Sequence, residues 1–218
     1  PDLFEANNNL GVAATQQGLY DEATNAFLRA LAVLPRSQIA NKNMGLALLE
    51  AGNFNGAATY LETAVLIDPN DVGGWLGLAK AQARMNHHEK AIGTFQHVLK
   101  LEPRLAEVYW LAGREWRALG NFDSAIVCYQ HAVGLNPFYA DAYFELAQVY
   151  ADTQAEEMSL EYYRKTLAAN ALHLSALNNL AWMLATSPKH QTRNAEEAVD
   201  LAEQACRLTN YKEAVFVG

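Results

Sequence analysis

Four cations in the middle of the chain have types and spacings suited to binding a carboxylate. Lys80 and Arg84 are four residues apart, so their side chains would share one face of a helix. Arg114 and Arg117 are three residues apart and would share a face of another helix. Arginine binds carboxylates through two parallel hydrogen bonds, and Trp110 is a large aromatic side chain that could anchor a ligand beside them. The group predicts a local site for an acidic or aromatic peptide segment.

The same residues have an alternative role in packing. Glu107, Asp141 and Glu145 could pair with the cations as ordinary bridges between neighbouring helices, which contribute little stability when exposed. Trp110 could likewise fill space between helices. Phe144 is counted with the ligand-binding group because its ring could serve as a second anchor. Both interpretations stay open at this point.

Motifs for catalysis, metal binding and nucleotide binding are missing from the sequence. No G-x-S-x-G, H-E-x-x-H, P-loop or EF-hand pattern occurs, and the glycines of DVGGWLGLA follow no predicted strand. His87 and His88 fall in a predicted turn, where we expect them to be solvated. His97 and His131 are expected on an outer helix surface. The sequence therefore predicts no catalytic residue, no metal, no cofactor and no enzymatic activity.

The composition is that of a folded, acidic protein. Of 218 residues, 51% are hydrophobic and 18% are charged, and the formal net charge is -8. The acidic balance argues against nucleic-acid partners, and no apolar run is long enough for membrane insertion. Cys128 and Cys206 form no C-x-x-C pair and are expected to be reduced, packed thiols. The compartment stays open, with a slight preference for the cytoplasm.

A period of 34 residues runs through the chain. At this offset a turn residue and a proline each recur in four units, namely Gly18, Gly52, Asn86 and Gly120, and Pro35, Pro69, Pro103 and Pro137. A small and a bulky residue recur in the same way, at Ala23, Ala57, Ala91 and Ala125, and at Phe27, Leu61, Phe95, Tyr129 and Tyr163. The period predicts a single array of six units over residues 4–37, 38–71, 72–105, 106–139, 140–173 and 174–212.

Each unit is predicted to be a helical hairpin. In residues 106–139, small and apolar residues recur at helical spacing in two stretches. Gly120 and Asn121 separate the stretches, and Asn136 with Pro137 ends the second because proline cannot continue a helix. One hairpin alone cannot bury both of its faces, whereas stacked hairpins can, so the array should form a solenoid.

The pattern resembles the tetratricopeptide repeat, in which an aromatic, Leu-Gly, a second aromatic, Ala, Phe, Ala and Pro recur in 34 residues. Repeats 1 and 4 match it most fully, and the resemblance covers essentially the whole chain. It implies an all-α, right-handed superhelix in which the first helix of every hairpin lines a concave groove. The stretch LNNLAWMLATSP is similar to bacterial members of the family, so we expect a bacterial source.

Repeats 5 and 6 depart from the family pattern. Repeat 5 has Ser159, Thr166 and Ala171 where alanine, alanine and proline are usual, so we expect its second helix to run on or bend differently. Repeat 6 carries an insertion near residues 187–193, whose proline and polar residues predict an exposed loop.

In this family the second, fifth, sixth, ninth, twelfth and thirteenth residues of each unit supply most of the concave surface. The resemblance thereby gives the candidate residues for binding a peptide or partner, which are Asn9, Lys42, Asn43, Lys80, Arg84, Trp110, Arg114, Arg117, Phe144, Gln148, Asn179 and Trp182. Two devices of the family are incomplete here. Only Asn43 matches the carboxylate clamp, and the asparagine ladder at the sixth position is interrupted by Gly77, Leu111 and Glu145.

Two functional hypotheses follow from the resemblance. The first is a non-enzymatic scaffold that binds a protein or peptide, acidic or aromatic, in the groove. The alternative is the recognition arm of a larger enzyme, such as a glycosyltransferase similar to the O-linked N-acetylglucosamine transferases. Pro1 and residues 211–218 resemble parts of further repeats, so we expect a fragment of a longer protein. Self-association through the terminal repeats is a further hypothesis.

Overall fold

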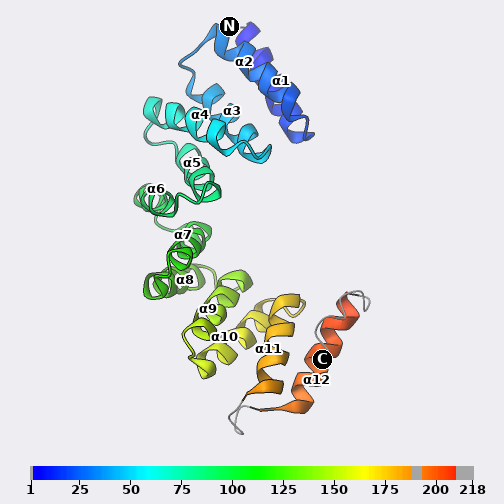
Figure 1. Cartoon of the computed structure of the whole chain (residues 1–218). Coiled ribbons are helices and arrows are strands. Elements are labelled where there is room, and N and C mark those ends of the chain that lie inside the picture. The colour runs from blue at the N-terminus through cyan, green and yellow to red at the C-terminus, as the bar shows by residue number, and fades with distance from the viewer. Residues whose placement is uncertain (1, 188–192, 210–218) are drawn as a thin grey trace. The chain divides into compact units, whose positions relative to one another are not determined.

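The computed structural model describes residues 2–187 and 193–209, which form helices joined by short turns (Figure 1). The helices in chain order are α1 (Asp2–Gln16), α2 (Tyr20–Val33), α3 (Gln38–Glu50), α4 (Phe54–Ile67), α5 (Val72–Arg84), α6 (His88–Leu101), α7 (Ala106–Ala118), α8 (Phe122–Leu135), α9 (Ala140–Asp152), α10 (Glu156–Ala169), α11 (Leu174–Thr186) and α12 (Ala195–Leu208). Most of the predicted insertion and the predicted helix start at 211–218 lie outside the described residues.

The chain divides into two compact units, Pro1–Leu119 with α1 to α7 and Gly120–Gly218 with α8 to α12. In the first unit, α1 packs on α2, α3 on α4 and α5 on α6, and each hairpin contacts the helix that follows it. In the second unit, α9 packs on α10 and α11 on α12. The boundary between the units falls between the two helices of the fourth sequence repeat. The expected fold class, an all-α array of helical hairpins, is confirmed.

The turn inside each of the first five hairpins uses one left-handed residue. Positive φ angles recur every 34 residues, at Gly18 (72°), Gly52 (82°), Asn86 (58°), Gly120 (72°) and Gln154 (59°). Glycine reaches this region without a clash because it has no Cβ, and asparagine reaches it at modest cost. The glycines that mark the period in the sequence are therefore required by the turn, and Gln154 is the strained member of the series.

The second helix of repeat 5 ends at the register at which α8 ends in repeat 4, so the expectation that it would run on is wrong. Helix α10 stops at Ala169, and Asn170 is extended with φ -146° and ψ 96°. Asn170 Oδ1 accepts a hydrogen bond from the Leu172 N–H at 3.1 Å, as Asn136 Oδ1 does from the Phe138 N–H at 3.1 Å. This side-chain bond fixes the turn without a proline at position 171.

The repeated small residues lie where helices of one hairpin approach most closely. Ala23, Ala57 and Ala91 are fully buried, and the first two belong to the same core cluster as Phe27 and Leu61. A Cβ atom at Gly11 would lie 2.5 Å from Cε1 of Phe27, closer than two atoms can pack. The sequence period is therefore a record of helix packing, and it says nothing about the ligand.

Candidate functional site

A cavity of about 440 Å³ lies between α5 and α7 in the first unit. Lys80 and Arg84 of α5 and Arg114 of α7 line it, so the helical spacing read from the sequence brings three of the four cations together. Arg117 lies about one turn further along α7 and is half-buried. We call this site the basic cavity, lined by Leu49, Lys80, Ala83, Arg84, Asn86, His88, Phe95, Leu111, Arg114, Glu115 and Ala118.

The three cations are held by different contacts. Lys80 Nζ lies 2.8 Å from Glu107 Oε1, with 35% and 54% of the two side chains exposed, so solvent screens the pair and it contributes little stability. The guanidinium of Arg84 lies 4.6 Å from the centre of the Phe54 ring. That of Arg114 lies 5.0 Å from the Trp110 ring. Stacking on an aromatic ring holds a guanidinium in place without neutralising its charge.

His88 corrects the expectation of solvated turn histidines. It is the first residue of α6, and its Nδ1 lies 2.7 Å from Glu115 Oε2 on α7. Both side chains are largely buried, and both line the basic cavity. The pair therefore joins the third repeat to the fourth and shapes the cavity wall. His87 is exposed, as expected.

The expectation for the other two histidines holds for one of them. His131 is exposed on α8. His97 is half-buried, and its ring packs against Trp75 with 4.3 Å between the ring centres, so it does not lie on the outer surface. The close approach of α5 to α6 draws this histidine into the hairpin.

A second cavity, of about 220 Å³, lies between α1 and α3 of the same unit. We call it the apolar cavity, and it is lined by Val12, Thr15, Gln16, Phe27, Asn43, Leu46 and Glu50. Phe27 of α2 is almost fully buried and supplies a ring to its lining. Asn43 is the member of this lining that belongs to the candidate binding residues from the sequence, and its Nδ2 donates to Asn8 Oδ1 at 3.2 Å.

Lys42 forms an ion pair with Asp71, the residue that caps the following hairpin. Its Nζ lies 3.0 Å from Asp71 Oδ1, and Gln38 Nε2 donates to Asp71 Oδ2 at 2.8 Å. Asp71 is also the N-cap of α5, since its Oδ2 accepts from the Gly74 N–H at 2.9 Å. Lys42 therefore binds the next repeat, and it lines neither cavity. Asn9, another candidate from the sequence, is exposed on α1 and also lies outside both linings.

The candidates of the second unit lie on α9 and α11. Phe144 packs against Tyr163 and His173, with 5.8 Å and 4.7 Å between ring centres. Asn179 Nδ2 donates to the Tyr163 hydroxyl at 3.0 Å. These two candidates therefore share Tyr163 as a packing partner within the unit. Of the others, Gln148 is half-buried on α9 and Trp182 is 61% exposed on α11.

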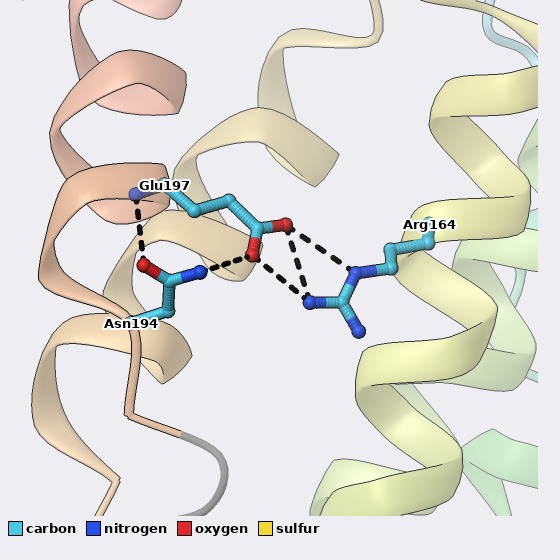
Figure 2. A network of polar contacts seen from close by, with 3 residues as sticks. All are labelled: Arg164, Asn194 and Glu197. Carbon is cyan, nitrogen blue, oxygen red and sulfur yellow. Dashed lines mark hydrogen bonds and ion pairs between the residues drawn. The ribbon is translucent and has the colours of Figure 1, made fainter.

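The helix after the insertion is tied back to repeat 5 by the network in Figure 2. Arg164 Nη2 donates to both carboxylate oxygens of Glu197, at 3.2 Å and 3.1 Å. Asn194 Oδ1 accepts from the Glu197 N–H at 3.1 Å, while Asn194 Nδ2 donates to Glu197 Oε2 at 3.0 Å. Glu197 thus belongs to a reciprocal cap of α12 and also to a bridge between repeats.

Residues 2–187 and 193–209 offer neither a metal site nor a membrane-spanning helix. No group of three or more His, Cys, Asp or Glu side chains there could hold a metal ion. The helices in these ranges are too short or too polar to cross a membrane. Cys128 and Cys206 are free thiols, and burial raises the pKa of Cys128 to about 11, so this thiol stays protonated at neutral pH.

Four family models match the chain. Those described as "Tetratricopeptide repeat" match residues 7–34, 48–114 and 140–171, and one described as "TPR repeat" matches residues 113–154. The chain belongs to the tetratricopeptide repeat family. This fold is a protein-interaction module, so a protein or peptide is the class of partner.

Individual proteins resemble the chain over different lengths. The PEX5-related protein of Mus musculus is 29% identical over 99 residues, which are 45% of this chain and 16% of that protein. The chain thus spans about a sixth of that relative. The crystal structure of MamA, 25% identical, covers 78% of this chain and 97% of its own, with a TM-score of 0.69. A thermophilic TPR protein of Thermus thermophilus, 24% identical, covers 84% and 100%, with a TM-score of 0.62.

These similarities support the family and the fold. The Thermus protein is consistent with the bacterial source that we expect. The comparisons do not favour the alternative of an enzyme's recognition arm.

Proposed function

We propose that the chain is a non-enzymatic scaffold that holds an acidic peptide segment of a partner protein in the basic cavity. One observation carries this proposal. Lys80, Arg84 and Arg114 converge on one cavity of about 440 Å³ in a chain whose formal net charge is -8. A concentration of positive charge against the overall balance attracts an acidic ligand locally, whereas the acidic remainder of the surface repels such a ligand.

The contacts of the cations favour binding over a purely structural role. Arg84 is held by the Phe54 ring, so its donors are positioned for a carboxylate at little further cost in side-chain entropy. The exposed pair of Lys80 and Glu107 can exchange its carboxylate for that of a ligand, because such pairs are worth only about 0–1 kcal/mol. Apolar side chains in the lining give an acidic segment with hydrophobic neighbours further contacts.

Charge reversal in the cavity tests the proposal. The double variant Lys80→Glu/Arg114→Glu should lose at least about tenfold in affinity for a fluorescein-labelled glutamate-rich peptide, measured by fluorescence anisotropy. The matched control is Lys100→Glu/Arg104→Glu, which makes the same charge change at exposed positions outside the cavity. Thermal unfolding followed by circular dichroism checks that both variants keep the fold. Unchanged affinity in the cavity variant, or equal losses in both, would contradict the proposal.

The dependence of peptide binding on salt concentration is a second test of the proposal. Raising the ionic strength should weaken binding to the wild-type chain, because mobile ions screen the cations of the cavity. Affinity capture from cells with the wild-type chain and the cavity variant then names the natural partner as the protein lost from the second sample.

A further inference from the structure

We infer that the ligand of the first unit is an extended segment that places one apolar side chain in the apolar cavity and an acidic residue in the basic cavity, about five or six residues apart. This inference rests on the proposed function and specifies the ligand in more detail. It follows from the positions, sizes and charges of the two cavities.

The two cavities lie along one row of helices. The apolar cavity lies between α1 and α3, and the basic cavity lies between α5 and α7. Helix α3 contributes to both, with Leu46 lining the first and Leu49 lining the second. Because α3 packs against both α1 and α5, one chain segment that crosses α3 can reach the two cavities together.

The apolar cavity has the size and lining for a single apolar side chain. Its volume of about 220 Å³ is smaller than the sites of drug-sized ligands, which begin at about 300 Å³. Val12, Phe27 and Leu46 give it an apolar interior. Asn43 lies in the lining, and its amide uses only one donor for Asn8, so a second N–H and the carbonyl remain for a peptide backbone.

Charge fixes which end of the segment enters which cavity. Glu50 lines the apolar cavity and would repel an acidic residue there. The lining of the basic cavity has three cations, Lys80, Arg84 and Arg114, and one carboxylate, Glu115, while the Glu107 carboxylate lies beside Lys80. An acidic residue is therefore favoured only in the basic cavity, and the register of the ligand is set by this difference.

The spacing follows from helix packing. Neighbouring helices lie about 8–10 Å apart, and the two cavities are two helix intervals apart, which gives about 16–20 Å. An extended chain advances about 3.3 Å per residue, so this distance corresponds to about five or six residues.

Synthetic peptides test the inference on the full 218-residue chain. The reference peptide carries a fluorescein label, one leucine, four serines and two glutamates, so its acidic residues follow the leucine at the fifth and sixth places. Three comparison peptides replace the leucine with serine, shorten the serine spacer to one residue, or replace both glutamates with glutamine. The serine peptide and the short-spacer peptide both lose the free energy of burying the leucine side chain. Each should therefore bind about tenfold more weakly than the reference peptide, as measured by fluorescence anisotropy.

A protein variant identifies where the leucine binds. Thr15→Trp should fill the apolar cavity and reduce the preference for leucine over serine to less than about twofold. Gln17→Trp adds the same ring at an exposed residue outside the lining and should keep the preference. If Thr15→Trp does not fold, the spacer series on the wild-type chain still decides.

The possible failures are distinguishable. Equal affinities for the leucine, serine and short-spacer peptides, with the glutamates still required, would overturn the inference and leave the proposed function standing. Binding that does not depend on the glutamates or on Lys80 and Arg114 would overturn the proposed function, and the inference with it. Absence of binding by the reference peptide would overturn both.

Discussion

Glu107 Oε1 lies 2.8 Å from Lys80 Nζ, so a carboxylate of the protein itself already lies beside the cavity's lysine. A ligand carboxylate must compete with it. The variant Glu107→Gln should therefore raise the affinity for a glutamate-rich peptide about two- to fivefold. Its free energy of unfolding should change by less than about 0.5 kcal/mol, because solvent screens the Lys80–Glu107 pair. Isothermal titration calorimetry measures the first quantity and urea unfolding the second.

The control for this variant is Glu102→Gln, which removes an exposed carboxylate outside the cavity. Weaker binding by Glu107→Gln, or the same gain in both variants, would show that Glu107 does not compete with the ligand.

Ala171 can be changed to the proline of the family at a gain in stability. The residue before it, Asn170, already has the extended conformation that precedes proline, with φ -146° and ψ 96°. Ala171→Pro should stabilise the second unit by about 0.4–1 kcal/mol because it restricts the unfolded chain. Leu172→Pro is the matched control, since it removes the N–H that bonds to Asn170 and should destabilise. Urea unfolding distinguishes the two, and a loss of stability in Ala171→Pro would contradict the account of this turn.

Gln154→Gly should stabilise the chain by about 0.5–1 kcal/mol, because a side chain is strained in the left-handed region. Gln154 has a φ of 59° at the position where three other repeats have glycine. The reverse change, Gly120→Gln, introduces the same strain at a φ of 72° and should lower the melting temperature. Differential scanning calorimetry compares both variants with the wild type, and changes of the opposite signs would refute the explanation.

Asn194→Ala should destabilise α12 by about 1 kcal/mol, the usual loss for an N-cap side chain. It also releases Glu197 from the orientation in which Arg164 binds it (Figure 2). Faster hydrogen exchange of the α12 amides measures the effect. Glu203→Ala removes only an exposed contact of 3.9 Å to Arg207 on the same helix. It should change the opening free energy obtained from hydrogen exchange by less than about 0.5 kcal/mol. Equal effects of the two variants would contradict the role of the cap.

Cys128 should react slowly with iodoacetamide at about pH 8. Burial raises the pKa of its thiol from 9.0 to about 11, so its thiolate fraction is about a hundredfold smaller than that of an unperturbed cysteine. The folded chain binds this proton more tightly than the unfolded chain, so its contribution to stability is complete below pH 9 and is lost as the pH rises towards 11. Mass spectrometry after timed alkylation tests the first statement, with the urea-unfolded chain as reference. Equal rates in the two states would contradict it.

The fold could be read from the sequence because its determinants are local and repeat. Gly120 marks a turn by its backbone conformation, and Pro137 ends a helix, so the role of each can be predicted from local sequence without knowledge of distant contacts. The misjudged element, α10, lacks its proline, and Asn170 performs the same task through a hydrogen bond. The dipeptide Asn170–Ala171 lies at the register of Asn136–Pro137, which is the signal that could have indicated this.

The candidate site was harder to predict from the sequence than the fold, because it depends on contacts between repeats. The pairs Lys80–Glu107 and His88–Glu115 both join residues 27 apart, a separation that no local pattern marks. Phe54 holds Arg84 from the preceding repeat, and Phe27 lines a cavity although the sequence assigns it to the core. The helical spacing of the cations brought three of the four to one cavity, and Glu107, named from the sequence as a possible partner of the cations, does pair with Lys80.

Asp71 has a consequence for how the first unit unfolds. Its carboxylate caps the N-terminus of α5 and also binds Lys42 and Gln38 of α3. The first turn of the third hairpin and its contact with the second hairpin therefore depend on the same two oxygens. In a linear array the cooperativity of unfolding is set by how strongly neighbours are coupled. Fraying of α5 at its N-terminus would release α3 as well, which penalises partly melted states and makes the second and third hairpins open and close together.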